Sequence, residues 1–210
     1  MNFLTLLFVA LNMEKKKKVK SKKRDLIELG IVLAVFAIIY LTGAQTEVFG
    51  KVQQAVLVTG VMNASAMDEA DYVDASYDFK LIDPEGNITD ANELKGKVIF
   101  MNIWATWCAP CVAEMPNINK LYGNVGDNPN IVFLMISHDK TMSKAVEWVK
   151  KKEFDFPIYQ LYTRLPDVYE TGVVPSTFVI SPEGKVVVQK VGMANYNARR
   201  FRKFIIELAD

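Results

Sequence analysis

Two cysteines, Cys108 and Cys111, are the whole cysteine content of this 210-residue chain, and only two residues separate them. If Cys108 stands at the first turn of a helix, the unpaired backbone N–H groups and the helix dipole favour its thiolate. Such a thiolate attacks a disulfide, and Cys111, one turn further along, then attacks Cys108 and releases the reduced substrate. The spacing therefore predicts a redox-active Cys108–Cys111 disulfide that works without a cofactor.

Two other uses of the cysteine pair have less support in the sequence. A permanent disulfide across so few residues closes a very short loop and would stabilise the fold little. A structural zinc site needs more ligands, but the chain has no second cysteine pair and one histidine, His138. We therefore predict no metal site. A chaperone that holds Cu(I) between the two thiols stays open as an alternative, because soft thiolates suit that ion.

The N-terminal region has the charge pattern of a membrane anchor. Residues 15–24 carry eight basic residues and no acidic one, and a largely apolar segment follows at once. Its length is at the short end of what crosses a bilayer, and basic residues on one flank only place the N-terminus in the cytoplasm. The sequence predicts a basic cytoplasmic tail over residues 1–25, a single transmembrane anchor in the lipid bilayer over residues 26–43, and an extracytoplasmic remainder.

Two further expectations concern this region. A signal peptide that is cleaved near Thr42-Gly43-Ala44 is the alternative to a retained anchor. We also expect translation to start at Met13, because Met-Glu-Lys-Lys is a conventional beginning for an anchored protein.

The rest of the chain predicts one α/β domain. A hydrophobic content of 50% suffices for one ordinary core. Residues 44–72 are interpreted as an amphipathic and acidic linker with a helix over 47–62, for which a continuous stalk is the alternative. Residues 73–210 alternate strand and helix patterns, which favours a mixed central sheet flanked by helices. No basic groove with interleaved aromatic residues is found, so nucleic acid is not an expected partner. The expected strands cover residues 77–82, 98–104, 130–137, 156–160, 176–180 and 185–191, and the expected helices cover 108–120, 141–152 and 197–208.

The segment WATWCAPC, which continues as CVAEMP, resembles the thioredoxin superfamily. In detail it is similar to the membrane-anchored, extracytoplasmic branch of TlpA-like and ResA-like thiol-disulfide oxidoreductases. The similarity covers about residues 73–210 and extends to FKLIDPEGN and ELKGKVIFMNIW before the pair and to VVPSTF after it. It implies a thioredoxin-like fold with an insertion between its two halves, preceded by the transmembrane helix.

The resemblance also implies roles for single residues. Cys108 is the nucleophile and Cys111 the resolving thiol. Pro175 matches a cis proline beside the disulfide, which presents the backbone of Val174 to an extended substrate segment. Trp107 is expected to cover the disulfide on the substrate side.

The chain departs from the cytosolic thioredoxins at the residue that would accept the proton of the resolving thiol, Cys111. Asn102 stands where those proteins usually have a buried aspartate, and an asparagine cannot take a proton from the resolving thiol. The branch's glutamate falls on Glu114, three residues after Cys111 on the same helix face. A partly buried Glu114 with a raised pKa would act as the proton partner; a solvated surface glutamate is the alternative.

The dipeptide between the cysteines indicates the direction of the reaction. Ala109-Pro110 contains no histidine, basic residue or acid, which favours a reducing couple over a strong oxidant. We expect a reductase of disulfide-bearing proteins outside the cytoplasm. Its Cys108–Cys111 disulfide is then reduced again by a membrane thiol relay, a membrane component that passes on electrons through its own thiols. The resemblance adds the haem-binding cysteines of apocytochrome c as substrates. A disulfide-forming oxidase is the alternative, and a peroxide reductase is not expected because its PxxTxxC context is absent.

Overall fold

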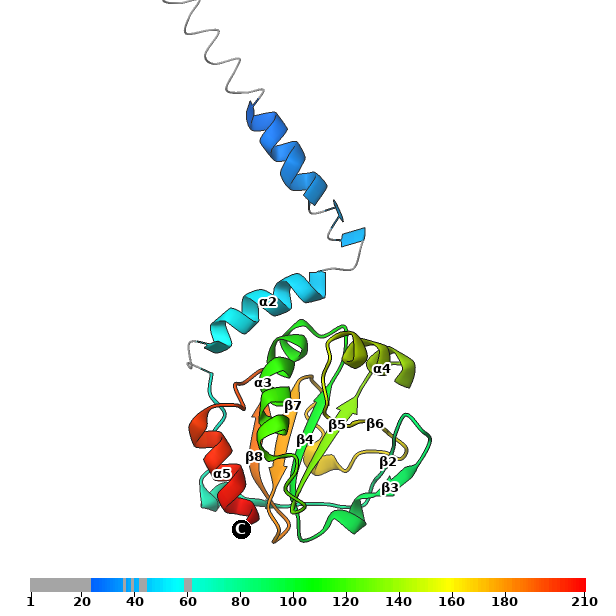
Figure 1. Ribbon diagram of the computed structural model, residues 1–210, viewed down its shortest axis with the longest axis vertical. Coiled ribbons are helices and arrows are strands. Elements are labelled where there is room, and N and C mark those ends of the chain that lie inside the picture. Colours follow the sequence, from blue (N-terminus) through cyan, green and yellow to red (C-terminus); the bar gives the residue numbers. More distant parts are fainter. Residues whose placement is uncertain (1–23, 36, 39, 42–44, 59–61) are drawn as a thin grey trace, which may run out of the picture. The chain divides into compact units, whose positions relative to one another are not determined.

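The computed structural model describes residues 24–35, 37–38, 40–41, 45–58 and 62–210 (Figure 1). The chain divides into two units, Met1–Gln45 and Thr46–Asp210. In the first unit, the described residues between 24 and 41 are helical. Most of the expected tail, Met13, the cleavage site at 42–44 and anchor positions 36, 39, 42 and 43 lie outside the described residues. Among the residues that are described, no helix has both the length and the apolar character needed to span a bilayer.

The second unit contains a mixed sheet, as the sequence predicts. Its order within residues 62–210 is β1-β8-β7-β4-β5-β6-β2-β3 (Figure 1). The neighbours β4 and β5, and β5 and β6, are parallel, and the other neighbours are antiparallel. The strands are β1 (Val73–Asp74), β2 (Lys80–Ile82), β3 (Ile88–Asp90), β4 (Val98–Trp104), β5 (Ile131–Ser137), β6 (Ile158–Leu161), β7 (Ser176–Ile180) and β8 (Lys185–Val191).

Helices cover one face of this sheet. Figure 1 shows α3 in front of it, and α5 packs Phe201 and Ile205 into the same core as α3. The described helices are α2 (Gln45–Val58), α3 (Ala109–Val125), α4 (Met142–Lys151) and α5 (Arg199–Ala209), with short 3-10 turns η1 (Glu69–Asp71), η2 (Ala91–Leu94) and η3 (Asp167–Tyr169). α5 buries Phe201, Ile205 and Ala209, which recur every four residues and so share one helix face.

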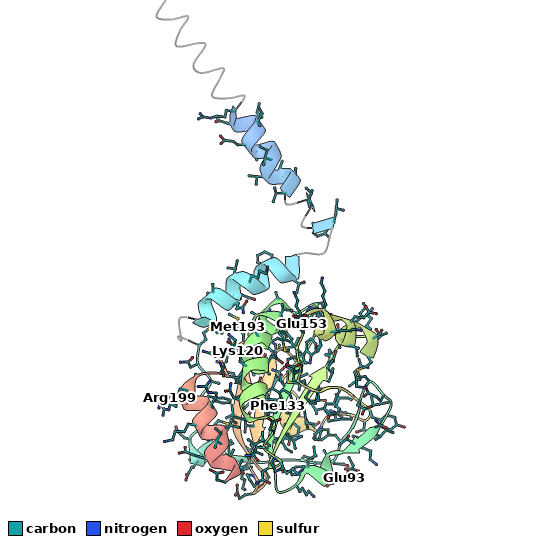
Figure 2. The ribbon with its side chains drawn as sticks, viewed as in Figure 1. Glu93, Lys120, Phe133, Glu153, Met193 and Arg199 are labelled. Carbon is teal, nitrogen blue, oxygen red and sulfur yellow. A yellow bond between two sulfur atoms is a disulfide. The ribbon has the colours of Figure 1, made fainter. Side chains whose placement is uncertain are left out.

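The side chains of β4 contribute to the hydrophobic cores on both faces of the sheet. All seven of its residues are buried. Because successive side chains of a strand point to opposite faces, Phe100 and Trp104 join the core beneath α3, whereas Met101 and Ile103 join a second core on the far face. Phe133 on β5, labelled in Figure 2, belongs to the first core and meets the ring of Tyr122 from α3 edge-on at 5.1 Å.

Two short strands were not predicted. β1 pairs with β8 through Val73 and Asp74, at the start of the expected domain. Just before it, the Met67 N–H donates to the Val187 carbonyl at 2.9 Å, so this part of the expected linker contacts the sheet edge. β3 closes a hairpin with β2. Strands of two or three residues carry almost no periodicity, and partners elsewhere in the chain specify them.

The helix expected over 47–62 is observed as α2 (Gln45–Val58), and residues 59–61 lie outside the described part of the chain. Thr141 does occupy the N-cap position of α4, but its side chain makes no capping hydrogen bond. It accepts instead from the Ser143 hydroxyl at 3.2 Å.

Candidate active site

The Cys108–Cys111 disulfide lies at the start of α3. Cys108 is the N-cap residue, and its Sγ accepts a hydrogen bond from the Cys111 N–H at 3.2 Å. Pro110 follows in the first turn, where a missing N–H breaks no helical hydrogen bond. The geometry directs the free N–H groups and the positive end of the helix dipole towards the Cys108 sulfur, which favours its thiolate.

The two sulfur-bearing residues differ in exposure. Cys108 retains 5% of its surface and Cys111 none. Trp107, directly before Cys108, is 60% exposed. A substrate that approaches from solvent therefore reaches Cys108 before Cys111, which fits the order of attack that the resemblance implies.

A buried carboxylate holds the loop that carries Cys108. Asp139, which follows β5, accepts two hydrogen bonds from Thr106: Oδ2 from the backbone N–H at 3.0 Å and Oδ1 from the hydroxyl at 2.7 Å. Oδ2 also accepts from the Ser137 hydroxyl at 3.0 Å. Since β4 and β5 are parallel neighbours, the residues that follow them meet at one edge of the sheet. Asp139 thereby positions Thr106, two residues before Cys108.

The structure places Glu114 inside the protein, with no exposed surface. The alternative of a solvated glutamate is excluded. The Asn102 amide Nδ2 donates to Glu114 Oε1 at 2.9 Å, and the Ala194 N–H donates to Oε2 at 3.1 Å. Asn102 Nδ2 also donates to the Thr177 hydroxyl at 2.8 Å. Asn102 and Thr177 are cross-strand partners on β4 and β7, and both face α3.

Burial raises the pKa of Glu114 to about 8, because the ionised carboxylate has lost its water. The hydrogen bonds from Asn102 and Ala194 and the positive charge of Lys190 act in the opposite direction but do not offset the loss. A carboxyl with this pKa exchanges protons near neutral pH, in the range of an ordinary thiol. Glu114 follows Cys111 by one helical turn.

The segment before β7 lies beside this site. The Val174–Pro175 peptide bond is cis, as the resemblance implies. β7 begins only at Ser176, and within residues 62–210 Val174 takes part in none of the backbone hydrogen bonds. Val174 and Trp107 line one cleft of about 640 Å³. An unpaired backbone next to a cleft is suited to bind an extended segment by strand addition.

Sequence reasoning missed the partners of these residues. Asp139 and Ala194 carry no motif of their own, Thr177 lies in the VVPSTF motif without a role assigned to it, and the contacts of all three come from segments that only the fold brings together. A signal existed for Asp139, because polar residues directly after a buried parallel strand often lie at a functional edge. Among the described residues, no group of three or more His, Cys, Asp or Glu side chains is arranged to hold a metal ion.

Comparisons with known proteins agree with this geometry. The model of the AhpC/TSA family matches residues 73–189. The thiol-disulfide oxidoreductase ResA of Bacillus cereus (strain ZK / E33L) is 34% identical over 115 residues, which are 54% of this chain and 66% of that protein. The chain thus spans just under two thirds of that relative. ResA of Bacillus subtilis (strain 168) is 27% identical over 169 residues, 80% of this chain and 85% of that protein.

The solved structures establish the fold. A thiol:disulfide interchange protein of the thioredoxin family from Chlorobium tepidum TLS superposes with a TM-score of 0.54 and 22% identity. The match covers 68% of this chain and 99% of that one. The fold is therefore thioredoxin-like, with a mixed sheet and flanking helices.

Proposed function

Because this chain belongs to the AhpC/TSA family and carries a disulfide at the start of a helix, we propose that it is a thiol-disulfide oxidoreductase which reduces disulfides in other proteins. The observation that carries the proposal is the grouping of three features: a disulfide of which Cys108 retains 5% of its surface and Cys111 none, a cis proline preceded by unpaired backbone, and a fully buried glutamate one helical turn after Cys111. The relatives named ResA support this activity.

The reaction starts from the reduced protein. The Cys108 thiolate attacks one sulfur of a substrate disulfide, a new bond joins Cys108 to that sulfur, and the other substrate sulfur leaves and takes a proton. The Cys111 thiol then loses its proton and attacks the Cys108 sulfur, which releases the second substrate thiol. The substrate gains two electrons and two protons, and the protein is left with its Cys108–Cys111 disulfide.

Glu114 has the properties to handle the proton of Cys111. Cys111 has no exposed surface, so water does not reach its thiol freely. A neighbouring carboxyl whose pKa lies near that of a thiol takes up and returns a proton at little cost. In this proposal Glu114 accepts the proton that a buried aspartate accepts in cytosolic thioredoxins, because Asn102 at that position cannot.

The N-terminal charge pattern and the resemblance to an extracytoplasmic branch support a proposed cellular setting. We place the domain outside the cytoplasm, on an anchor formed by residues 26–43, with a membrane thiol relay as its electron donor. Disulfide-bearing extracytoplasmic proteins, among them apocytochrome c, are the proposed substrates. The neutral Ala109-Pro110 dipeptide supports the reducing direction.

A redox titration of the full chain in detergent tests the direction. We expect a reduction potential below about −200 mV, on the side of the reducing thioredoxins. A value near about −120 mV would make the protein a disulfide-forming oxidase. Cu(I) titration in parallel separates the chaperone alternative: tight Cu(I) binding without disulfide exchange would reject the oxidoreductase.

Trapping tests the roles of the two cysteines. In the Cys111→Ser variant the mixed disulfide on Cys108 cannot be resolved, so substrate proteins should accumulate on it in the native host. The Cys108→Ser variant is the matched control and should trap far less. Equal trapping by both variants would contradict the assignment of Cys108 as the nucleophile.

A further inference from the structure

A loop after β8 completes the hydrogen bonding of the buried glutamate. The loop covers residues 192–196, and its Ala194 N–H donates to Glu114 Oε2 at 3.1 Å. Its first residue, Gly192, donates its N–H to the carbonyl of the cis proline, Pro175, at 2.9 Å. The loop thus connects the cis proline with the buried carboxyl, and its position decides whether the Ala194 N–H reaches that carboxyl.

The segment by which the chain enters the domain, residues 62–64, holds this loop. The Asn195 N–H donates to the Met62 carbonyl at 2.8 Å, and the Ala64 N–H donates to the Asn195 carbonyl at 3.2 Å. Between them, Asn195 Nδ2 donates to Asn63 Oδ1 at 3.1 Å. Three hydrogen bonds therefore fix the loop residue that directly follows the donor to the carboxyl. We call residues 62–64 the entry segment.

The contact between the entry segment and the loop lies outside the strands of the sheet. It is an isolated parallel bridge between Asn63 and Asn195. Ala64 is buried in the same core as Cys111, whereas Asn63 is exposed. Because an isolated bridge adds no strand to the sheet, the effect of its hydrogen bonds is to fix the loop in one position.

The other groups around the buried carboxyl are charged or titratable in three cases among the described residues. The ammonium of Lys190 on β8 favours the ionised form. Tyr196, at the end of the loop, stays neutral, because burial raises its pKa well above the ordinary value. Cys111, one turn earlier on α3, is held in the disulfide of the oxidised protein, and β4 contributes the neutral amide of Asn102. A hydrogen bond to a carboxylate favours its charged form, so loss of the Ala194 N–H would raise the proton affinity of the carboxyl.

We propose that residues 62–64 position the loop 192–196 against Glu114 and so take part in the transfer of the Cys111 proton. The inference rests on the proposed function, since it takes Glu114 as the acceptor of that proton. The members of the entry segment are positioning residues, which act through the Ala194 N–H and take no part in the exchange of sulfur bonds. The held loop keeps a larger share of Glu114 ionised at neutral pH, and thus able to accept a proton.

Titration of Glu114 in the oxidised full chain, held in detergent, tests the proposal without turnover. The protein carries ¹³C at the side-chain carboxyl of its glutamates, and Glu114→Gln assigns the NMR signal. We expect a wild-type midpoint near pH 8. In Ala64→Pro, which removes the N–H that donates to Asn195, the midpoint should rise by about one pH unit.

Asn63 offers milder variants that leave the backbone donors intact. Asn63→Ala loses the side-chain hydrogen bond alone and should shift the midpoint less, in the same direction. Asn63→Asp keeps the accepting oxygen and should titrate as the wild type does. The Ala194 amide should also exchange with deuterium about tenfold faster in Asn63→Ala. A wild-type value of either quantity in Asn63→Ala would overturn the proposal, even if Ala64→Pro does not fold.

Met67→Pro is the matched control. It also removes a backbone hydrogen bond that fastens this part of the chain, from the Met67 N–H to the Val187 carbonyl, but it leaves the contacts of the loop 192–196 in place. Its free energy of unfolding should fall while the midpoint of Glu114 stays at the wild-type value. An equal rise of the midpoint in Met67→Pro and Ala64→Pro would overturn the positioning role, because general loosening would then suffice.

The same variants separate this proposal from the proposed function. The pH profile for resolution of a mixed disulfide should move upwards in Ala64→Pro together with the NMR midpoint. A moved midpoint with an unmoved profile would reject the proton role of Glu114 and leave the positioning by the entry segment intact. A chain that shows the NMR shifts but exchanges no disulfide would reject the proposed function alone.

Discussion

The Asn102 side chain donates a hydrogen bond to the carboxyl of Glu114 at 2.9 Å, and so links the central strand β4 to the helix that begins with the disulfide. The strand position that carries an aspartate in cytosolic thioredoxins is thus a neutral donor, and the ionisable group comes from α3 instead. Since the carboxyl is fully buried, its proton affinity depends on the packing around it.

The Glu114→Gln variant should resolve mixed disulfides more slowly, by about tenfold to a hundredfold, because an amide takes up no proton. The wild-type rate should also show an ionisation near pH 8 that the variant lacks. Stopped-flow measurement of disulfide exchange between pH 6 and 9 checks both. Glu207→Gln, an exposed position on α5, is the control; an identical pH profile in wild type and Glu114→Gln would reject the proton role.

Glu114 should also make the folded state less stable as the pH rises. Its pKa in the folded protein, about 8, exceeds the ordinary value of 4.5, so the native state keeps a proton that the unfolded chain releases. The free energy of unfolding should therefore fall between pH 4.5 and 8 and level off above, by on the order of 5 kcal/mol from this group. Denaturant titrations of the oxidised protein should show this slope reduced in Glu114→Gln. Parallel slopes in the two proteins would contradict the buried carboxyl.

The Asn102→Asp variant should be destabilised in a pH-dependent way. It places a second carboxyl against Glu114, so ionisation of both is opposed by repulsion and by lost hydration. We expect a loss of about 2–4 kcal/mol in the free energy of unfolding at pH 8 and a smaller loss at pH 4.5. Asn128→Asp, after the end of α3, is the control and should change little at either pH, because an aspartate can accept the same hydrogen bond from the Asn130 N–H.

The Thr106→Val variant should loosen the loop before Cys108. It removes the hydroxyl that donates to Asp139 Oδ1 and leaves a buried carboxylate oxygen without that partner. We expect the free energy of unfolding to fall by about 1–3 kcal/mol and disulfide exchange to slow. Thr106→Ser keeps the hydroxyl and should restore both. A Thr106→Val protein that unfolds and reacts as the wild type does would show that the hydroxyl contact with Asp139 has no positioning role.

Much of the fold was predictable from local pattern. The seven apolar residues of β4 and the run of β5 are long enough to be recognised as buried strands. The β7–β8 hairpin follows from its turn, where Gly184 adopts a φ of +78° that other residues rarely take. The cysteine spacing and the helix after it identified the candidate chemistry, and Glu114 was recognised through a family motif.

The sequence by itself determined the strands with strong periodicity, the helix starts and the pair of reactive residues, because these depend on neighbours within a few positions. Only the tertiary structure decided the state of Glu114. Its partners Asn102 and Ala194 lie 12 and 80 residues away in the chain, and it is their convergence on one buried carboxyl that sets its proton affinity. The same holds for the contact between Thr106 and Asp139 and for the cleft lined by Trp107 and Val174, since burial and contact between distant segments are properties of the packed domain.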